Sequence, residues 1–315
     1  MRVLGSATFH HILDTQRVEI MAQLNAKSTA EDVMRLVGDE TVQGKNIVVT
    51  GASSGIGAEA ARIFALSGAR VFALGRDQAK TLAVVDSINA ACGESRTTFV
   101  SCDLSSLASV RAAAATVNAM GLPLHVLLNN AGVMAIQSRE TTEDGFEMQL
   151  GTNHIGHFVL TNELMPLLKA GSPSRIVNVS SMAHRRGGVV FDDIMLEKAY
   201  DAWRSYGQSK SANILHAVEL QRRFGSEGVT ACSLHPGVIT DSDLWRHAGQ
   251  VMEANKNVPQ GASTSVFCAA APGVVGGGFY NDCALASAAS WATDPALAEQ
   301  LWMETEKLVA KVSGS

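Results

Sequence analysis

Tyr206 and Lys210 are the residue pair in this chain best suited to moving a proton at an organic substrate. They lie four positions apart, so on a helix both side chains share one face, one turn apart. A free tyrosine has a pKa of about 10, too high for a ready base at neutral pH. A neighbouring ammonium favours the tyrosinate and lowers that pKa. Neither Tyr200 nor Tyr280 has a lysine four residues later. The spacing therefore predicts an acid–base pair in which Lys210 tunes Tyr206.

A glycine-rich segment, Gly51-x-x-x-Gly55-x-Gly57, follows the apolar run 47–50 and opens a stretch with helical spacing. Glycines at a strand-to-helix turn let the backbone approach a pyrophosphate, and the helix N-terminus offers free N–H groups to that anion. The pattern predicts a dinucleotide cofactor. The segment's predicted contacts are Gly51, Ser53, Ser54, Gly55, Ile56 and Gly57. A nicotinamide would carry hydride, and Tyr206 would protonate the oxyanion that hydride transfer leaves on a carbonyl.

The second apolar run, 71–74, is followed by residues that bear on cofactor choice. NAD enzymes usually place an acid near this point to hold the ribose 2′-OH. Here Gly75 occupies the expected position of the acid and Arg76 follows, and a guanidinium suits a 2′-phosphate. The sequence predicts a preference for NADP(H) over NAD(H). In the alternative, Arg76 is a surface residue that opens a helix, and Asp77 would suit the cap of that helix.

The motifs require a scaffold that brings distant segments together. Strand-like segments at 47–50, 71–74, 97–101, 125–128, 175–179 and 229–234 alternate with helical segments at 58–67, 77–91, 105–120, 143–168 and 203–224. Such alternation predicts an α/β fold: a single-domain Rossmann-type doubly wound parallel sheet with helices on both faces, spanning 44–312. Residues 1–43 are predicted to be an N-terminal extension with a short helix, which a capping box at Ser28-Thr-Ala-Glu31 would start.

Composition limits the classes of partner. The 315 residues are 46% hydrophobic and 17% charged, with a net charge of −5, which argues against nucleic acid as the main partner. No run approaches the roughly 20 apolar residues of a membrane span. The five cysteines show no metal-binding spacing, so we predict no metal site. A cytoplasmic enzyme is the expectation.

In their order along the chain, these motifs resemble the short-chain dehydrogenase/reductase superfamily. The resemblance rests on Thr50–Gly57, Asp103-Leu104, Asn129–Gly132, Asn153, Ser181, Tyr206/Lys210 and Pro236-Gly237. Within it, segments 153–158, 180–184 and 235–238 are similar to the branch of retinol dehydrogenases and WW-domain oxidoreductases, although no WW domain is present.

The resemblance implies roles for further residues. The implied catalytic tetrad is Asn153, Ser181, Tyr206 and Lys210. In it, Ser181 would hydrogen-bond the substrate oxygen, Asn153 would support a water relay to Lys210, and Lys210 would also hold the nicotinamide ribose. The further cofactor contacts that it implies are Asp103, Leu104, Asn130, Ala131, Gly132, Pro236, Gly237, Val238, Ile239 and Thr240.

The substrate is expected to be a small alcohol, ketone or aldehyde. In the family, the segment corresponding to 241–258 covers the substrate. Leu244, Trp245 and Met252 would make that cover apolar and the substrate lipophilic, although the same side chains would also suit ordinary helix packing. A homo-oligomer would be common for the family.

Several alternatives stay open at this point. Ser180, rather than Ser181, could be the participant in catalysis, and Asn153 could simply cap or kink its helix. Gly51-Ala-Ser53-Ser-Gly55 also fits the nucleophile elbow of a serine hydrolase, with Ser53 as nucleophile and His235 as base. A non-catalytic NADP sensor on the same fold is a third possibility.

Overall fold

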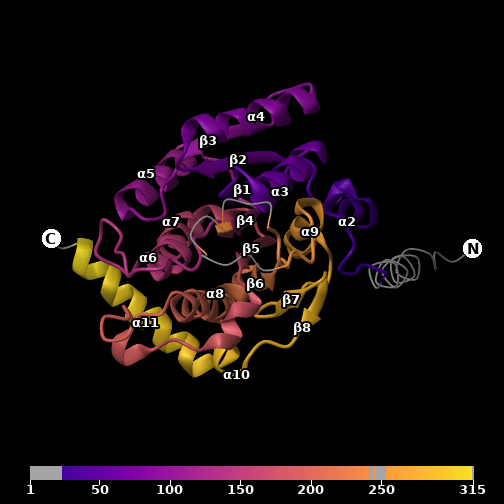
Figure 1. Cartoon of the computed structure of the whole chain (residues 1–315). Coiled ribbons are helices and arrows are strands. Elements are labelled where there is room, and N and C mark those ends of the chain that lie inside the picture. Colours follow the sequence, from indigo (N-terminus) through magenta and orange to yellow (C-terminus); the bar gives the residue numbers. More distant parts are fainter. Residues whose placement is uncertain (1–22, 241–243, 246–247, 249–252, 314–315) are drawn as a thin grey trace, which may run out of the picture.

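The computed structural model describes residues 23–240, 244–245, 248 and 253–313 (Figure 1). In this part of the chain, one sheet of eight strands has the order β3-β2-β1-β4-β5-β6-β7-β8. The strands are β1 Asn46–Thr50, β2 Arg70–Gly75, β3 Thr97–Ser101, β4 Val126–Asn129, β5 Ser174–Val179, β6 Val229–His235, β7 Phe279–Asn281 and β8 Ala284–Ala286. All pairs are parallel except β7 with β8, which is antiparallel.

Helices cover both faces of the sheet (Figure 1). The helices are α2 Ala30–Val37, α3 Gly55–Leu66, α4 Gln78–Cys92, α5 Leu107–Asn118, α6 Met148–Leu150, α7 Gly156–Ala170, α8 Ala202–Phe224, α9 Val258–Ala270, α10 Ser290–Thr293 and α11 Pro295–Ser313. Side chains of α2, α3, α4 and α9 pack on one face, and those of α5, α7, α8 and α11 pack on the other. This is the predicted doubly wound α/β architecture. Among the described residues, no helix is long and apolar enough to cross a membrane.

The central strand β1 shows why its run is continuously apolar. Ile47 and Val49 enter the core on one face of the sheet, whereas Val48 enters the core on the other. Successive side chains of a strand point to opposite faces, so a strand covered on both sides needs apolar residues at every position. The six predicted strands are all confirmed as β1 to β6.

The helix predicted over 143–168 starts later than expected. Gly145 has φ +84° in a turn before it, and the helical stretch begins only at Met148, where Glu147 accepts from the N–H groups of Gln149 and Leu150. A π-helical turn, Gly151–Ile155, then separates α6 from α7. Such turns are rare and are frequent at functional sites.

The short helix before residue 43 is confirmed, but its cap is one residue from the predicted place. Thr29 is the N-cap of α2, and Asp32 completes the capping box instead of Ser28 and Glu31. The buried face of α2 joins the same core as α3 and α9, and α2 lies beside α9 (Figure 1).

The β7–β8 hairpin is a feature that the sequence reading did not anticipate. Its strands have three residues each, too few for a recognisable pattern. Its two-residue turn has positive φ at both Asp282 (51°) and Cys283 (61°). Such turns favour Asn-Gly, so Asp-Cys gives no turn signal in the sequence.

Candidate active site

A cleft of about 480 Å³ opens at the carboxyl ends of the strands. The chain runs from β1 outward to β3 on one side and returns through β4 on the other, so β1 and β4 flank the point where strand order reverses. Ligands of open α/β sheets bind at such points. The predicted residues that line the cleft are Gly51, Ser53, Ser54, Gly55, Ile56, Gly57, Arg76, Asp103, Leu104, Asn130, Ala131, Gly132, Ser181, Tyr206, Lys210, Pro236, Gly237, Val238 and Ile239. Asn153 and Thr240 are not among its lining residues.

Around the glycine turn between β1 and α3, the positions of Gly51 and Gly57 leave no room for a side chain. Gly51 has φ +70°, and a Cβ atom there would lie 2.9 Å from the Ala131 Cα atom. A Cβ atom at Gly57 would overlap the Gly51 carbonyl oxygen and the Asn130 side chain. Ser54 is the N-cap of α3 and makes no side-chain cap hydrogen bond. The first-turn N–H groups of α3 can therefore bind an anion in the cleft.

The Thr50 hydroxyl joins this turn to the loop after β4. Its Oγ1 atom accepts hydrogen bonds from the N–H groups of Asn130 (2.9 Å) and Ala131 (3.0 Å), and it lies 2.8 Å from His157 Nε2. His157 Nδ1 lies 2.9 Å from the Asn153 carbonyl oxygen. Because a carbonyl oxygen only accepts, Nδ1 carries the proton and Nε2 accepts from Thr50. Burial lowers the pKa of His157 to about 4, which keeps the ring neutral.

The sequence did not predict this contact between Thr50 and His157. The residues it joins are 107 positions apart, and no local signal marks the contact.

Tyr206 and Lys210 lie one turn apart on α8, as predicted, and both are buried. Lys210 Nζ donates to the Val179 carbonyl oxygen (3.1 Å) and lies 5.5 Å from the centroid of the Tyr206 ring. Burial raises the pKa of Tyr206 to about 12, although a hydrogen bond with Ser181 acts in the opposite direction. Burial also lowers the pKa of Lys210 to about 7. The expected lowering of the Tyr206 pKa by Lys210 is not found, because desolvation is the largest influence on both groups.

Ser181 and Ser180 have different partners. Ser180 Oγ is buried and donates to the Lys210 carbonyl oxygen at 2.7 Å, which ties β5 to α8. Ser181 lies at the start of the 3₁₀ helix Met182–Arg186, where its Oγ accepts from Ala183 N–H and also contacts Tyr206. This geometry favours Ser181 over Ser180 as the hydroxyl that meets a substrate oxygen.

Asn153 lies in the π-helical turn behind the cleft. Its Oδ1 accepts from Val133 N–H (2.8 Å), and its Nδ2 donates to the Val133 carbonyl (2.9 Å) and to Ser209 Oγ (2.9 Å). A Cβ atom at Gly132 would lie 2.9 Å from Asn153 Oδ1. The side chain is thus engaged in holding the loop after β4 against α8.

The end of β2 clarifies the roles of Asp77 and Gly75. Asp77 is the N-cap of α4 and accepts from Lys80 N–H at 3.0 Å, as the capping alternative predicts. A Cβ atom at Gly75 would overlap the Thr81 hydroxyl, which donates to the Asp77 carbonyl. Arg76 is exposed and lines the cleft, and Lys80, which sequence reasoning missed, lines it as well.

Apolar residues gather beside Tyr206 at the other end of the cleft. Met134, Trp203, Leu244 and Trp245 all pack in this cluster and line the cleft. Trp245 Nε1 donates to the Ile239 carbonyl at 2.7 Å, which fixes the indole in place. Sequence reasoning identified Leu244 and Trp245 but missed Met134 and Trp203. The third expected cover residue, Met252, lies outside the described residues, as does most of 241–252.

The hydrolase alternative does not fit the sheet. Ser53 follows β1, whereas His235 ends β6, three strands away in the strand order. Neighbouring strands are about 4.8 Å apart, so the two residues are separated by roughly 14 Å, far beyond hydrogen-bond reach. His235 Nδ1 instead accepts from Met182 N–H.

Comparison with known proteins identifies the family of the chain. The short chain dehydrogenase family model matches residues 45–252. Retinol dehydrogenase 11 from Homo sapiens is 43% identical over 273 residues, which cover 83% of this chain and 85% of that protein. Polyprenol dehydrogenase from Mus musculus is 42% identical over 288 residues, which cover 86% and 85% respectively.

A solved structure shows the same relationship in three dimensions. It is a blue fluorescent protein from a metagenomic library, in complex with NADPH, with 27% identity, a TM-score of 0.62, and coverage of 76% of this chain and 96% of that one. The chain belongs to the short-chain dehydrogenase family. Within the family it falls in the retinol-dehydrogenase-like branch, and it is a nicotinamide-dependent oxidoreductase that acts on alcohol or carbonyl groups. This classification removes the sensor and hydrolase alternatives.

Proposed function

We propose that the protein is an NADP(H)-dependent dehydrogenase or reductase of a lipophilic alcohol, aldehyde or ketone, with Tyr206 as its acid–base residue. The observation that carries the proposal is the convergence of a buried Tyr206–Lys210 pair, Ser181 and the glycine turn on one cleft at the switch point of the sheet. The nicotinamide supplies hydride when it is bound.

The residues around Tyr206 divide the remaining work. Ser181 holds the substrate oxygen, and Tyr206 exchanges a proton with that oxygen as its charge changes. Lys210 supplies positive charge near the tyrosine and a donor for the nicotinamide ribose. The Tyr206 pKa of about 12 disfavours the tyrosinate, and the Lys210 pKa of about 7 disfavours the ammonium, so both values oppose these roles. A bound ligand that places charge or hydrogen-bonding groups beside the pair would bring the two values back toward their ordinary ranges.

The implied role of Asn153 is a proposal of the same kind. Its carbonyl oxygen accepts from His157 and has a second lone pair, through which a water molecule could connect it to Lys210. The side chain is already engaged with Val133 and Ser209, so any relay would run through the backbone carbonyl.

Cofactor preference is proposed from the charge at the end of β2. Arg76 and Lys80 line the cleft, and the Asp77 carboxylate is engaged as a helix cap. The two cations outnumber the Asp77 carboxylate, so the net charge at the end of β2 is positive, which suits a 2′-phosphate. The NADPH complex of the related structure is consistent with this preference.

A lipophilic substrate is proposed from the cluster of Met134, Trp203, Leu244 and Trp245 beside Tyr206. The two relatives named above are named for retinol and polyprenol, both long apolar alcohols. A cytoplasmic location and a homo-oligomer remain predictions.

The decisive experiment is a spectrophotometric screen of purified protein with NADPH and NADH. The panel should contain aldehydes and ketones of increasing apolar length and a matched set of short polar carbonyls. We expect turnover with NADPH that improves with apolar length. Turnover confined to the short polar set would contradict the proposed substrate class.

Tyr206→Phe is the variant that tests the chemistry. It keeps the ring and its packing but removes the hydroxyl, and general acid catalysis is typically worth about 10²–10⁴-fold. We expect kcat to fall by that range, with NADPH affinity and unfolding midpoint close to wild type. If the variant turns over a good substrate at the wild-type rate, Tyr206 is not the acid.

A further inference from the structure

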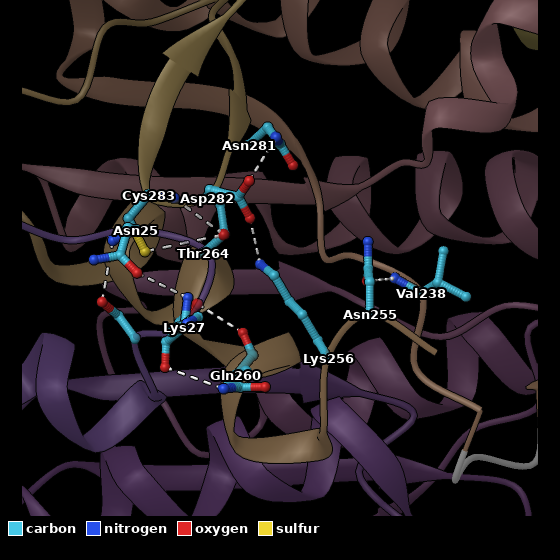
Figure 2. A network of polar contacts seen from close by, with 12 residues as sticks. Asn25, Lys27, Val238, Asn255, Lys256, Gln260, Thr264, Asn281, Asp282 and Cys283 are labelled. Atoms are coloured by element: carbon cyan, nitrogen blue, oxygen red, sulfur yellow. Dashed lines mark hydrogen bonds and ion pairs between the residues drawn. The ribbon is translucent and has the colours of Figure 1, made fainter. Parts of the chain in front are cut away.

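Lys256 carries a buried positive charge that the proposed chemistry does not use. Its side chain is 2% exposed, and its Nζ atom lies 2.6 Å from Oδ1 of Asp282, whose side chain is 34% exposed (Figure 2). Removing an ammonium from water is costly, and apolar residues of similar size often pack in such places with equal or better stability. The pair therefore calls for an explanation other than stability.

Asp282 reaches Lys256 from a strained position. It is the first residue of the β7–β8 turn, in which Asp282 and Cys283 both have positive φ. Asn-Gly would adopt this turn with less strain. The carboxylate is also oriented by Asn281, whose Nδ2 donates to Asp282 Oδ2 at 3.0 Å. Strain that persists in a well-packed region points to a functional constraint.

The residues next to the ion pair hold the wall of the cleft. Val238 N–H donates to Asn255 Oδ1 at 2.8 Å (Figure 2). The Val238 carbonyl accepts from the N–H groups of Asn255 (3.1 Å) and Lys256 (3.3 Å). Gly237 has φ +100°, and a Cβ atom there would lie 2.7 Å from Lys256 Cδ. Both polar groups of the Val238 backbone and the surface of Gly237 are therefore fixed by residues 255–256.

The Lys256–Asp282 pair also lies beside the carboxyl end of β6, where His235 is the last residue. Lys256, Asp282 and His235 line a side cavity of about 250 Å³, which shares Met182, His235 and Gly237 with the main cleft. His235 Nδ1 accepts from Met182 N–H at 3.2 Å, next to Ser181. Burial and, to a smaller extent, the Lys256 charge lower the pKa of His235 to about 4, and the Asp282 charge opposes this.

We propose that the Lys256–Asp282 ion pair is a positioning device that holds Gly237 and Val238 against the nicotinamide end of the cofactor. It acts on hydride transfer through that wall and does not touch the reacting atoms. The inference rests on the proposed function, in which hydride transfer takes place beside Tyr206. Trp245 packs in the cluster with Tyr206 and donates to the Ile239 carbonyl, so the wall formed by Gly237 and Val238 lies at the Tyr206 end of the cleft, where the nicotinamide would bind.

The test is a double variant that removes both charges of the Lys256–Asp282 pair and the backbone strain at Asp282. In Lys256→Met/Asp282→Gly, methionine keeps an apolar chain of similar length and glycine accepts the positive φ. We expect its unfolding midpoint to equal or exceed that of wild type. Its Kd for NADPH should nevertheless rise about tenfold and kcat should fall by a similar factor, because misplacement by about 1 Å can cost up to a hundredfold. Lys256→Met/Asp282→Asn keeps the shape of the Asp282 side chain and should behave likewise if the first variant folds poorly.

Two measurements separate positioning from general damage. Binding of the adenine half alone, as 2′-phospho-ADP-ribose, should be unchanged in both double variants. Lys169→Met/Glu227→Gln removes a more exposed ion pair of similar length, 2.8 Å, away from the cleft and should leave the NADPH Kd and kcat at wild-type values.

The outcomes are distinct. A stable double variant with wild-type NADPH affinity and kcat would overturn the inference and leave the proposed function intact. Equal loss of affinity for NADPH and for the adenine half would also overturn it, because the effect would not be confined to the nicotinamide end. Wild-type protein that binds neither compound would overturn the proposed function itself.

Discussion

Arg76 is the residue on which cofactor choice is expected to depend. A charge-assisted hydrogen bond contributes about 1.5–3 kcal/mol, and about 1.4 kcal/mol is a factor of ten in affinity. Arg76→Ala should therefore weaken NADPH binding roughly ten- to hundredfold and change NADH little. Titration of both cofactors against wild type and variant measures this. If both cofactors weaken equally, or if wild type already prefers NADH, Arg76 does not discriminate between them.

The reverse change, a carboxylate at Gly75, needs a second substitution. Because a Cβ atom at Gly75 would overlap the Thr81 hydroxyl, Gly75→Asp alone is expected to lower the unfolding midpoint. Thr81→Ala makes room, so the double variant should shift preference toward NADH, with Thr81→Ala alone as its control.

The buried charge of Lys210 is expected to lower the free energy of unfolding, although the residue is proposed to serve cofactor binding. Its folded pKa of about 7 lies below the ordinary value of 10.5, so between these values the unfolded state binds more protons than the folded state. Wild-type stability should therefore rise as pH increases from 7 to 10.5. Lys210→Met should be more stable than wild type at pH 6, by roughly a few kcal/mol, and this advantage should shrink toward pH 10.

Urea unfolding of wild type and Lys210→Met from pH 6 to pH 10, with NADPH binding measured in parallel, tests both expectations. The variant should bind NADPH more weakly because it lacks the proposed ribose donor. A stability difference that does not vary with pH would refute the buried charge as its cause.

At the scale of elements, His157 is expected to hold three of them together: β1, the loop after β4 and the π-helical turn. His157→Phe removes the 2.8 Å acceptor of the Thr50 hydroxyl, which then has only the Leu128 carbonyl at 3.4 Å to donate to, and it removes the side-chain donor to the Asn153 carbonyl. An unsatisfied buried group costs about 1–3 kcal/mol. We expect a lower free energy of unfolding in urea and weaker cofactor binding. Combining Thr50→Val with His157→Phe should cost less than the sum of the single changes. Strict additivity would mean that the two side chains are not coupled.

The elements also show where sequence reasoning succeeds. Apolar runs predicted the inner strands such as β1 and β4, because strands covered on both faces leave that signature. The edge strand β3, which is partly exposed, was predicted as an extended segment. The same logic failed for β7 and β8, which are short and joined by an unfavourable turn sequence. The helix predicted from residue 143 begins later, because Gly145 adopts a positive φ in a turn before it. The capping box is formed by Thr29 and Asp32, because both Ser28 and Thr29 are residue types that can cap a helix.

The sequence predicted the residues that line the cleft more fully than the residues that hold this lining in place. Motif residues such as Gly51, Arg76 and Tyr206 were found because their type and spacing carry the signal. Thr50–His157 and Lys256–Asp282 were not, because each joins segments far apart in the sequence. Thr240 and Asn153 were placed in the site by resemblance, yet neither lines the cleft.

For the whole molecule, buried histidines are expected to set the acid limit of stability. Burial lowers the pKa of His154 to about 3 and those of His157 and His235 to about 4, and it lowers the pKa of His216 as well. Below pH 6.5 the unfolded chain binds protons that the folded chain excludes, so stability should fall as pH drops from 6.5 to about 4.

A ring whose pKa falls from 6.5 to about 4 costs the folded protein about 3 kcal/mol at pH 4, so the combined loss from these rings should be on the order of 10 kcal/mol. Thermal melts between pH 7 and 4 measure it. His154→Phe removes one titrating ring and should make the decline shallower. An unfolding midpoint that stays level down to pH 4 would show that these rings are already charged in the folded protein.

The packing of α2 against α9 has a consequence for how the chain is made. About 220 residues separate the end of α2 at Val37 from the start of α9 at Val258. At roughly 5–20 residues per second, a ribosome needs about 10–45 s to synthesise that stretch. Throughout this interval the apolar face of α2 has emerged without the helix that covers it. The nascent protein therefore offers chaperones the apolar face of α2 as a binding segment, and that face is covered only after α9 has been synthesised.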